Sequence, residues 1–159
     1  MNRPSHIRDA LLQMPLFAEF TENEVDAFLG LVEPMMVEGD KVLVRQDEPG
    51  GVMYIIIDGA VRVIHRRNKR EFHLATLTIG DFFGEIALVD QGPRSADVIT
   101  MGPCVLVALE ASVIRALAGV YPGAAFKLLI AVGRVLVERM RQGNKKYVDS
   151  LLIAARSEE

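Results

Sequence analysis

Short β-forming runs separated by turn signals constrain the fold of this chain more than any other feature. Between residues 35 and 110 the runs read KVLVRQ, VMYIIID, AVRVIH, EFHLATLTI, DVITM and CVLVAL. The segments between them contain EGD, DEPGG, DG, RNKR, IGD and GP, which are typical of turns. Strands this short, at a spacing of about 8–12 residues, indicate a β-sandwich or barrel and argue against a parallel α/β sheet.

Helical patterns flank the β-rich region on both sides. Residues 21–24 read TENE, a capping-box sequence that predicts the start of a helix, and Pro34 disfavours its continuation. After residue 110, helical spacing predicts a short helix to about Gly119, a break at residues 121–123 and a long helix to about Ala155. The expected fold is therefore mainly β with flanking helices.

Composition and charge are those of a soluble domain. The chain has 159 residues, of which 50% are hydrophobic and 25% charged, and its net charge of -3 gives no bias toward nucleic acid or anionic membrane. The single cysteine, Cys104, allows no internal disulfide, and the run LLIAVGRVLV is too short and interrupted to span a bilayer. We expect a cytoplasmic protein with one domain over residues 1–159, divided into helices at 1–34, a β region at 35–110 and helices at 111–157.

Residues 82–98 interrupt the strand series and read FFGEIALVDQGPRSADV. GEIALVD has helix-forming residues for about two turns, and a helix N-terminus with Gly84 at its entrance suits an anion such as phosphate. Arg94 adds donors that can hold a phosphate through two parallel hydrogen bonds. Glu85 would repel phosphate, but it can accept a hydrogen bond from a hydroxyl such as a ribose 2′-OH. A ligand carrying both groups would satisfy both residues; a structural Glu85–Arg94 ion pair is the alternative.

The same stretch resembles the phosphate-binding cassette of cyclic nucleotide-binding domains, whose pattern is roughly F-G-E-[LI]-[AS]-L, a short spacer and P-R-[AST]-A. Residues 83–96 fit this pattern, and the similarity covers roughly residues 10–145. Asp47 departs from the family, which usually has glycine there, but aspartate tolerates a left-handed turn. The resemblance implies a β-roll, a double-stranded jelly-roll barrel with N-terminal helices, a short cassette helix and a long C-terminal helix.

The resemblance also implies a cyclic nucleotide as the ligand. The cyclic phosphate would meet Arg94, Ser95 and backbone N–H groups of the cassette helix, while Glu85 would accept the ribose 2′-OH. The purine would rest against strand residues, and Ser95 favours cAMP over cGMP because binders of cGMP often have threonine there. The expected binding residues are Phe83, Gly84, Glu85, Ile86, Ala87, Arg94, Ser95, Val63, Leu74 and Arg139.

The long C-terminal helix is expected to act as a dimer seam and as a lid. One stripe of small and apolar residues recurs along it: Leu129, Gly133, Leu136, Met140, Gly143, Tyr147 and Ala154. A helix of about 30 residues is about 45 Å long, more than the domain can cover, so part of it should form a two-fold homodimer. Packing of the stripe on the barrel is the alternative. In relatives this helix closes over the base, and Arg139 falls near that position, where it either stacks on the purine or stays in solvent.

No pattern indicates catalysis, metal binding or DNA recognition. The chain has no Ser-His-Asp set and no Walker loop, so no enzyme is expected. His6, His65 and His73 do not cluster as metal ligands do, and no cofactor is expected beyond the nucleotide ligand. The segment past Lys146 contains no helix-turn-helix, so we expect no DNA-binding domain, no direct nucleic acid binding and no membrane association. The basic run HRRNKR is either a solvated hairpin loop or a surface for a partner.

The predicted function is that of a stand-alone regulatory module. It would bind cAMP through the cassette, signal by movement of the C-terminal helix and act on an unknown effector protein. Two alternatives keep the same fold. In one, the ligand is cGMP or a cyclic dinucleotide; in the other, the domain is a ligand-free scaffold for protein interactions.

Overall fold

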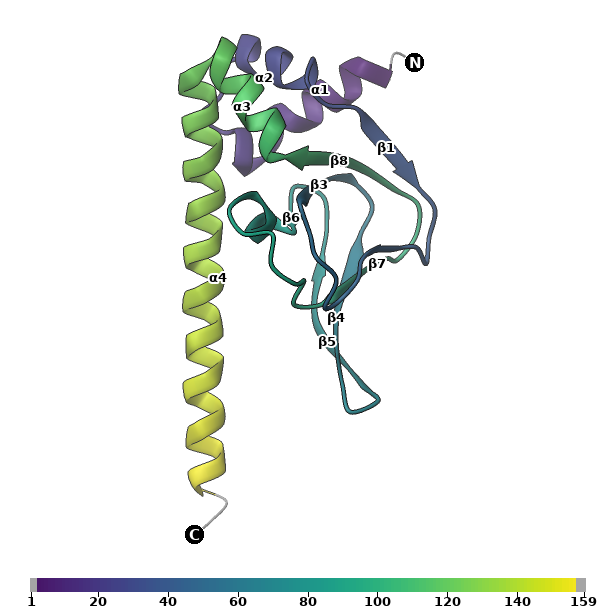
Figure 1. Cartoon of the computed structure of the whole chain (residues 1–159), viewed down its shortest axis with the longest axis vertical. Coiled ribbons are helices and arrows are strands. Elements are labelled where there is room, and N and C mark those ends of the chain that lie inside the picture. The colour runs from purple at the N-terminus through teal and green to yellow at the C-terminus, as the bar shows by residue number, and fades with distance from the viewer. Residues whose placement is uncertain (1–2, 157–159) are drawn as a thin grey trace.

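The computed structural model of the chain describes residues 3–156 and places two antiparallel sheets at its centre (Figure 1). Within these residues one sheet has the order β1 (Pro34–Val37), β8 (Cys104–Glu110), β3 (Val52–Asp58) and β6 (Phe82–Phe83). The other has the order β2 (Val42–Val44), β7 (Asp97–Thr100), β4 (Val61–Arg67) and β5 (Arg70–Leu77). The predicted β-roll is therefore confirmed.

Helices cover one end and one side of the roll. The N-terminal helices α1 (Arg3–Gln13), η1 (Pro15–Phe17) and α2 (Glu22–Leu29) lie at one end together with α3 (Ala111–Val120). The long helix α4 (Pro122–Arg156) runs down one side and extends past the sheets (Figure 1). The predicted capping box is present, because Thr21 and Glu24 exchange side-chain to backbone hydrogen bonds of 2.8 and 3.3 Å.

Strand β3 is apolar on both faces because it separates two hydrophobic clusters. Met53 and Ile55 join the cluster under the helices, which includes Phe28. Ile56 points the other way and packs with Phe83 inside the roll. Alternate side chains of a strand face opposite sides, so a strand between two cores has no polar face.

Three local features differ from the sequence-based expectation or refine it. The runs that were predicted as strands do not include β1 or β6, which are four and two residues long. The cassette helix η2 (Glu85–Leu88) is a 3₁₀ helix of four residues, shorter than the two turns that were expected. Asp47 has a φ of +67°, so aspartate does adopt the left-handed conformation at the position where the family usually has glycine.

Helix α4 is anchored only along its first part. Leu136 is partly buried and packs against the cluster under the helices. Every residue from 141 to 155 is exposed. No helix in the described part of the chain combines the length and apolarity that a membrane crossing requires.

Candidate functional site

The cassette begins where β6 ends, at a glycine that turns the chain. Gly84 directly precedes η2 and has a φ of +77°. This is a left-handed backbone conformation that residues with a side chain rarely adopt. Glu85 and Ala87 are buried, whereas Ile86 is 55% exposed. The N–H of Ala87 donates to the Gly84 carbonyl at 3.1 Å. The N–H groups of Glu85 and Ile86 have no acceptor within the turn, as is general at a helix start.

Arg94 is held across the mouth of the cassette by backbone carbonyls. Its Nη2 donates to the Val52 carbonyl at 2.8 Å, and its Nη1 lies 3.3 Å from the Gly84 carbonyl. The Arg94 main chain exchanges 2.9 Å hydrogen bonds with Asp47 and Glu48. Among the described residues no carboxylate oxygen lies within 4 Å of the guanidinium, so its charge is not neutralised by a neighbour.

Two glycines leave the space that the Arg94 side chain occupies. A Cβ atom on Gly50 would overlap the guanidinium, and a Cβ on Gly84 would lie 2.7 Å from Nη1 and 2.8 Å from the Val52 carbonyl oxygen. The neighbouring Gly51 has nothing within 4 Å of such a Cβ. Gly50 and Gly84 thus fix where Arg94 lies by having no side chain.

Glu85 pairs with α4, not with Arg94. Its Oε1 lies 2.9 Å from Arg139 Nη1, and the Glu85 side chain is only 10% exposed. Arg139 Nη2 also donates to the Phe82 carbonyl at 2.6 Å, and its guanidinium carbon lies 5.0 Å from the centre of the Phe82 ring. The alternative of a Glu85–Arg94 ion pair is therefore wrong. Arg139 therefore lies at the cassette, where it bonds Glu85 and Phe82 and its side chain is 34% exposed. Its role as a lid stays a prediction.

The expected wall residues lie in three different environments. Val63 is half-buried and packs against the cluster inside the roll. Leu74 is 53% exposed, at the irregularity where β5 slips by one residue against β4. Phe83 is 3% exposed and stacks on Tyr54 with ring centres 5.3 Å apart, so it belongs to the roll interior.

Ser95 is exposed, and the ring of His65 lies against its main chain. His65 Nδ1 lies 3.0 Å from the Ser95 carbonyl oxygen. Sequence reasoning placed neither His65 nor Phe82 at the site. No local pattern signals these contacts, because His65 is 30 residues from Ser95 and Phe82 is 57 residues from Arg139.

The surroundings of the cassette bear on two other kinds of site, a metal site and a groove. Within the described residues, no group of three or more His, Cys, Asp or Glu side chains gathers as a metal site would. A groove of about 360 Å³ lies between η2 and the start of α3, bounded by residues such as Leu88, Ser112 and Arg115. Neither Glu85 nor Arg94 lines that groove, whereas Ala87, one of the expected binding residues, does, so the groove adjoins the expected nucleotide site.

A family model described as the cyclic nucleotide-binding domain matches residues 35–121, a range that contains the cassette and both sheets apart from Pro34. The chain belongs to this family. Among known relatives of this cyclic nucleotide-binding domain is the cGMP-dependent protein kinase egl-4 of Caenorhabditis briggsae, which is 31% identical over 109 residues. That match covers 67% of the chain but only 15% of the kinase.

Solved structures agree with this assignment. The catabolite activator protein of Thermus thermophilus is 28% identical and superposes with a TM-score of 0.74, over 84% of this chain and 61% of that one. A cyclic nucleotide-binding domain from Methylobacillus flagellatus has the same fold, with a TM-score of 0.79 at 24% identity, over 92% of this chain and 83% of that one.

Proposed function

We propose that this cyclic nucleotide-binding domain is a regulatory module that binds cAMP and transmits binding through α4. It would act by binding rather than catalysis, and its output would be a change in an effector that the sequence does not identify. The cassette would hold the phosphate and the ribose, while the inner face of the roll would receive the purine.

The observation that carries this proposal is the unneutralised guanidinium of Arg94. A half-buried cation that no carboxylate neutralises favours an anion nearby. A guanidinium has five N–H donors, of which the carbonyls of Gly84 and Val52 take two. The others are free to bind the cyclic phosphate, together with the start of η2 and the exposed Ser95.

Glu85 supplies the link between ligand and α4. We propose that its carboxylate accepts the ribose 2′-OH, although in this structure it bonds Arg139. A bound nucleotide would therefore share Glu85 with Arg139 or release it. Either response changes how α4 is held at the cassette, which gives a physical route from binding to helix movement.

The choice of cAMP rests on Ser95, since threonine at this position would favour cGMP. The name of the kinase relative points to cGMP, so cGMP is the closest competing ligand. A cyclic dinucleotide and a ligand-free scaffold are the remaining alternatives. We also propose a homodimer through the exposed part of α4.

Calorimetry with cAMP, cGMP and cyclic di-GMP tests this function directly. Wild-type protein should bind cAMP most tightly. Arg94→Ala should lose at least tenfold in affinity, because each charge-assisted hydrogen bond contributes roughly 1.5–3 kcal/mol. Arg94→Lys should also bind weakly, because an ammonium cannot reproduce the two-pronged contact.

Arg8→Ala is the matched control, because this arginine of α1 pairs with Glu22 and Asp26 of α2, among the N-terminal helices. It should bind cAMP as the wild type does. A folded Arg94→Ala protein with unchanged affinity would falsify the cassette assignment. Preference for another nucleotide in the panel would correct the ligand but keep the site.

A further inference from the structure

The backbone hydrogen bonds between β4 and β7 end next to the cassette. Beyond them, a histidine side chain of β4 contacts the chain that leads into β7. The last backbone pair between these strands joins Ile64 to Asp97. One residue further along β4, His65 Nδ1 lies 3.0 Å from the Ser95 carbonyl oxygen. A carbonyl oxygen can only accept, so Nδ1 carries the proton of this hydrogen bond.

His65 lies on the inner face of the roll, the face proposed to receive the nucleotide. Side chains alternate along a strand, so His65 shares its face with Val61 and Val63, which belong to the cluster inside the roll or pack against it. Its cross-strand neighbour Phe72 is 47% exposed. The imidazole therefore lies at the open rim of the roll, beside the exposed Ser95.

Resting on the proposed nucleotide site, we propose that His65 is a positioning residue of the cassette that makes nucleotide affinity depend on pH. Its Nδ1–H fixes the peptide after Ser95, and with it the direction of the Ser95 side chain. A second proton, taken up at Nε2, adds a positive charge next to the phosphate. Imidazole ordinarily changes charge between pH 5 and 8, whereas a cyclic phosphodiester keeps its single negative charge throughout this range.

The other charged groups around His65 do not reproduce this effect. Arg66 on β4 pairs with Glu71 of β5 at 2.9 Å and with Asp97 of β7 at 3.1 Å. The cassette contributes Arg94. Carboxylate and guanidinium groups ordinarily keep their charge between pH 6 and 8. The other imidazole of this hairpin, His73, bonds Thr76 Oγ1 at 3.1 Å and pairs with Ile64, on the opposite face from His65.

The test measures the Kd for cAMP by calorimetry at pH 6, 7 and 8, after thermal melts show that each variant is folded. Wild-type protein and the control His73→Asn should bind about threefold or more tightly at pH 6 than at pH 8. His65→Asn keeps an N–H donor for the Ser95 carbonyl but cannot titrate. It should match the wild type at pH 8 and show no change with pH. His65→Leu removes the donor and should bind more weakly at all three values.

Each departure from this pattern overturns a stated part of the proposal. A flat wild-type profile, or a wild-type profile in His65→Asn, overturns the pH dependence. Wild-type affinity in His65→Leu overturns the positioning role. If Arg94→Ala lowers affinity but no His65 variant has an effect, the proposed function stands and only His65 is misassigned. If no cyclic nucleotide binds, the proposed function fails and this proposal fails with it.

Discussion

Two arginines lie at the cassette, and their acceptors differ in charge. Arg94 donates to the neutral carbonyls of Val52 and Gly84, whereas Arg139 donates to the Glu85 carboxylate and to the Phe82 carbonyl. A guanidinium held by carbonyls keeps most of its positive charge for a further anion, while one paired with a carboxylate does not. Arg94 is therefore suited to bind an anionic ligand. Arg139 is suited to respond when the hydrogen bonds of Glu85 change.

Adjacent glycines allow a sharp test of where Arg94 must lie. A Cβ on Gly50 would overlap the Arg94 guanidinium, whereas a Cβ on Gly51 would meet nothing within 4 Å. The flexible end of Arg94 can move aside, so Gly50→Ala should leave the melting temperature nearly unchanged. It should nevertheless weaken cAMP binding about tenfold or more, because the displaced donors no longer face the phosphate. Gly51→Ala is the control, and equal affinities for the two variants would show that Arg94 does not need its observed place.

The role of Glu85 can be tested by comparing the affinities for cAMP and for a ligand that lacks the 2′-hydroxyl. If the carboxylate accepts the ribose 2′-OH, the wild type should bind cAMP at least tenfold more tightly than 2′-deoxy-cAMP, and Glu85→Ala should remove most of this preference. Arg139→Ala is the control, because it breaks the 2.9 Å ion pair but keeps the carboxylate. It should retain the preference. If both variants keep it, Glu85 has only a structural role.

Separation along the chain explains which parts of the candidate site could be predicted from the sequence. Gly84, Glu85, Arg94 and Ser95 lie within one short stretch, so their order along the chain already limits their positions. The His65–Ser95 and Arg139–Glu85 contacts join residues that are 30 and 54 positions apart. Such pairs depend on how the strands close the roll and where α4 crosses it, which no local spacing encodes.

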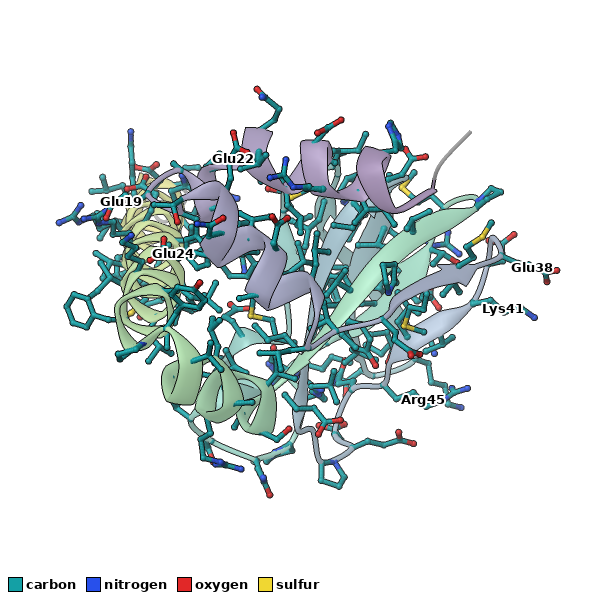
Figure 2. The ribbon with its side chains drawn as sticks, turned by 90° about the horizontal axis from the view of Figure 1, so that it is seen from above. Glu19, Glu22, Glu24, Glu38, Lys41 and Arg45 are labelled. Carbon is teal, nitrogen blue, oxygen red and sulfur yellow. The ribbon has the colours of Figure 1, made fainter. Side chains whose placement is uncertain are left out.

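At the scale of elements, α4 is fastened to the body by ion pairs at successive points. Lys127 bonds Glu24 at 2.8 Å, Arg134 bonds Glu19 at 2.9 Å, and Arg139 bonds Glu85 at 2.9 Å. Figure 2 shows Glu19 and Glu24 in the N-terminal helical layer beside α4. Two of these pairs fix α4 to the N-terminal region, one to α2 and one to the turn before it, whereas the third involves the cassette. Nucleotide binding would therefore loosen the Arg139–Glu85 pair, while the other two pairs would still hold the first part of α4 to the body.

The Glu24–Lys127 pair, one of the contacts that hold α4, should make the stability of the protein depend on pH. The Lys127 side chain, and then the Thr21 N–H, hold the pKa of Glu24 below its ordinary value of 4.5. A depressed pKa means that the contribution of Glu24 to stability is complete above about pH 4.5 and is lost as pH falls through the lower, folded-state value. Glu24→Gln should therefore lower the free energy of unfolding by about 1 kcal/mol or more at pH 7.

Urea unfolding of the wild type and Glu24→Gln, from pH 7 to pH 3, measures this contribution as a difference between the two proteins. The difference should shrink as the solution is acidified. Glu19→Gln is the control, since both sides of the Glu19–Arg134 pair are more than half exposed and such pairs contribute little. A Glu24 difference that is constant with pH would exclude the ionised carboxylate as its cause.

Element types were predictable where a β-forming run or a helical pattern extends over a full element, as in β3, β4 and α4. Strand β6 has only two residues, Phe82 and Phe83, and its pairing with Tyr54 and Ile55 is decided by the partner strand. The cassette helix is shorter than its composition suggests. Gly84 enters it in a left-handed conformation, and it ends after Leu88 as a single 3₁₀ turn.

At the scale of the whole molecule, the far part of α4 is the surface on which we expect a partner. A helix of 35 residues is about 52 Å long, and Figure 1 shows it passing beyond the sheets. Exposed apolar side chains, namely Val137, Met140, Tyr147, Val148 and Leu151, follow one another along it. At about 100° per residue they form one stripe, turned away from the face on which Arg139 meets the cassette. The predicted stripe thus divides: Leu136 packs on the body and Met140 and Tyr147 do not.

A second copy of the chain would cover this stripe by a two-fold contact between α4 helices. Light scattering at concentrations well above micromolar should give wild-type protein a mass twice that of the 17.5 kDa chain, with and without cAMP. Leu151→Lys places a charge in the stripe and should yield a monomer, because burying an unpaired ammonium costs more than the contact supplies. Gln142→Lys adds the same charge on the opposite side of the helix, so it should remain a dimer. A monomeric wild type would refute the dimer, and a dimeric Leu151→Lys protein would place the dimer contact on another surface.

Because Arg139 lies on the same helix as the stripe, a dimer would also connect the two cassettes through their α4 helices. Leu151→Lys should therefore change cAMP affinity as well as mass, whereas Gln142→Lys should change neither.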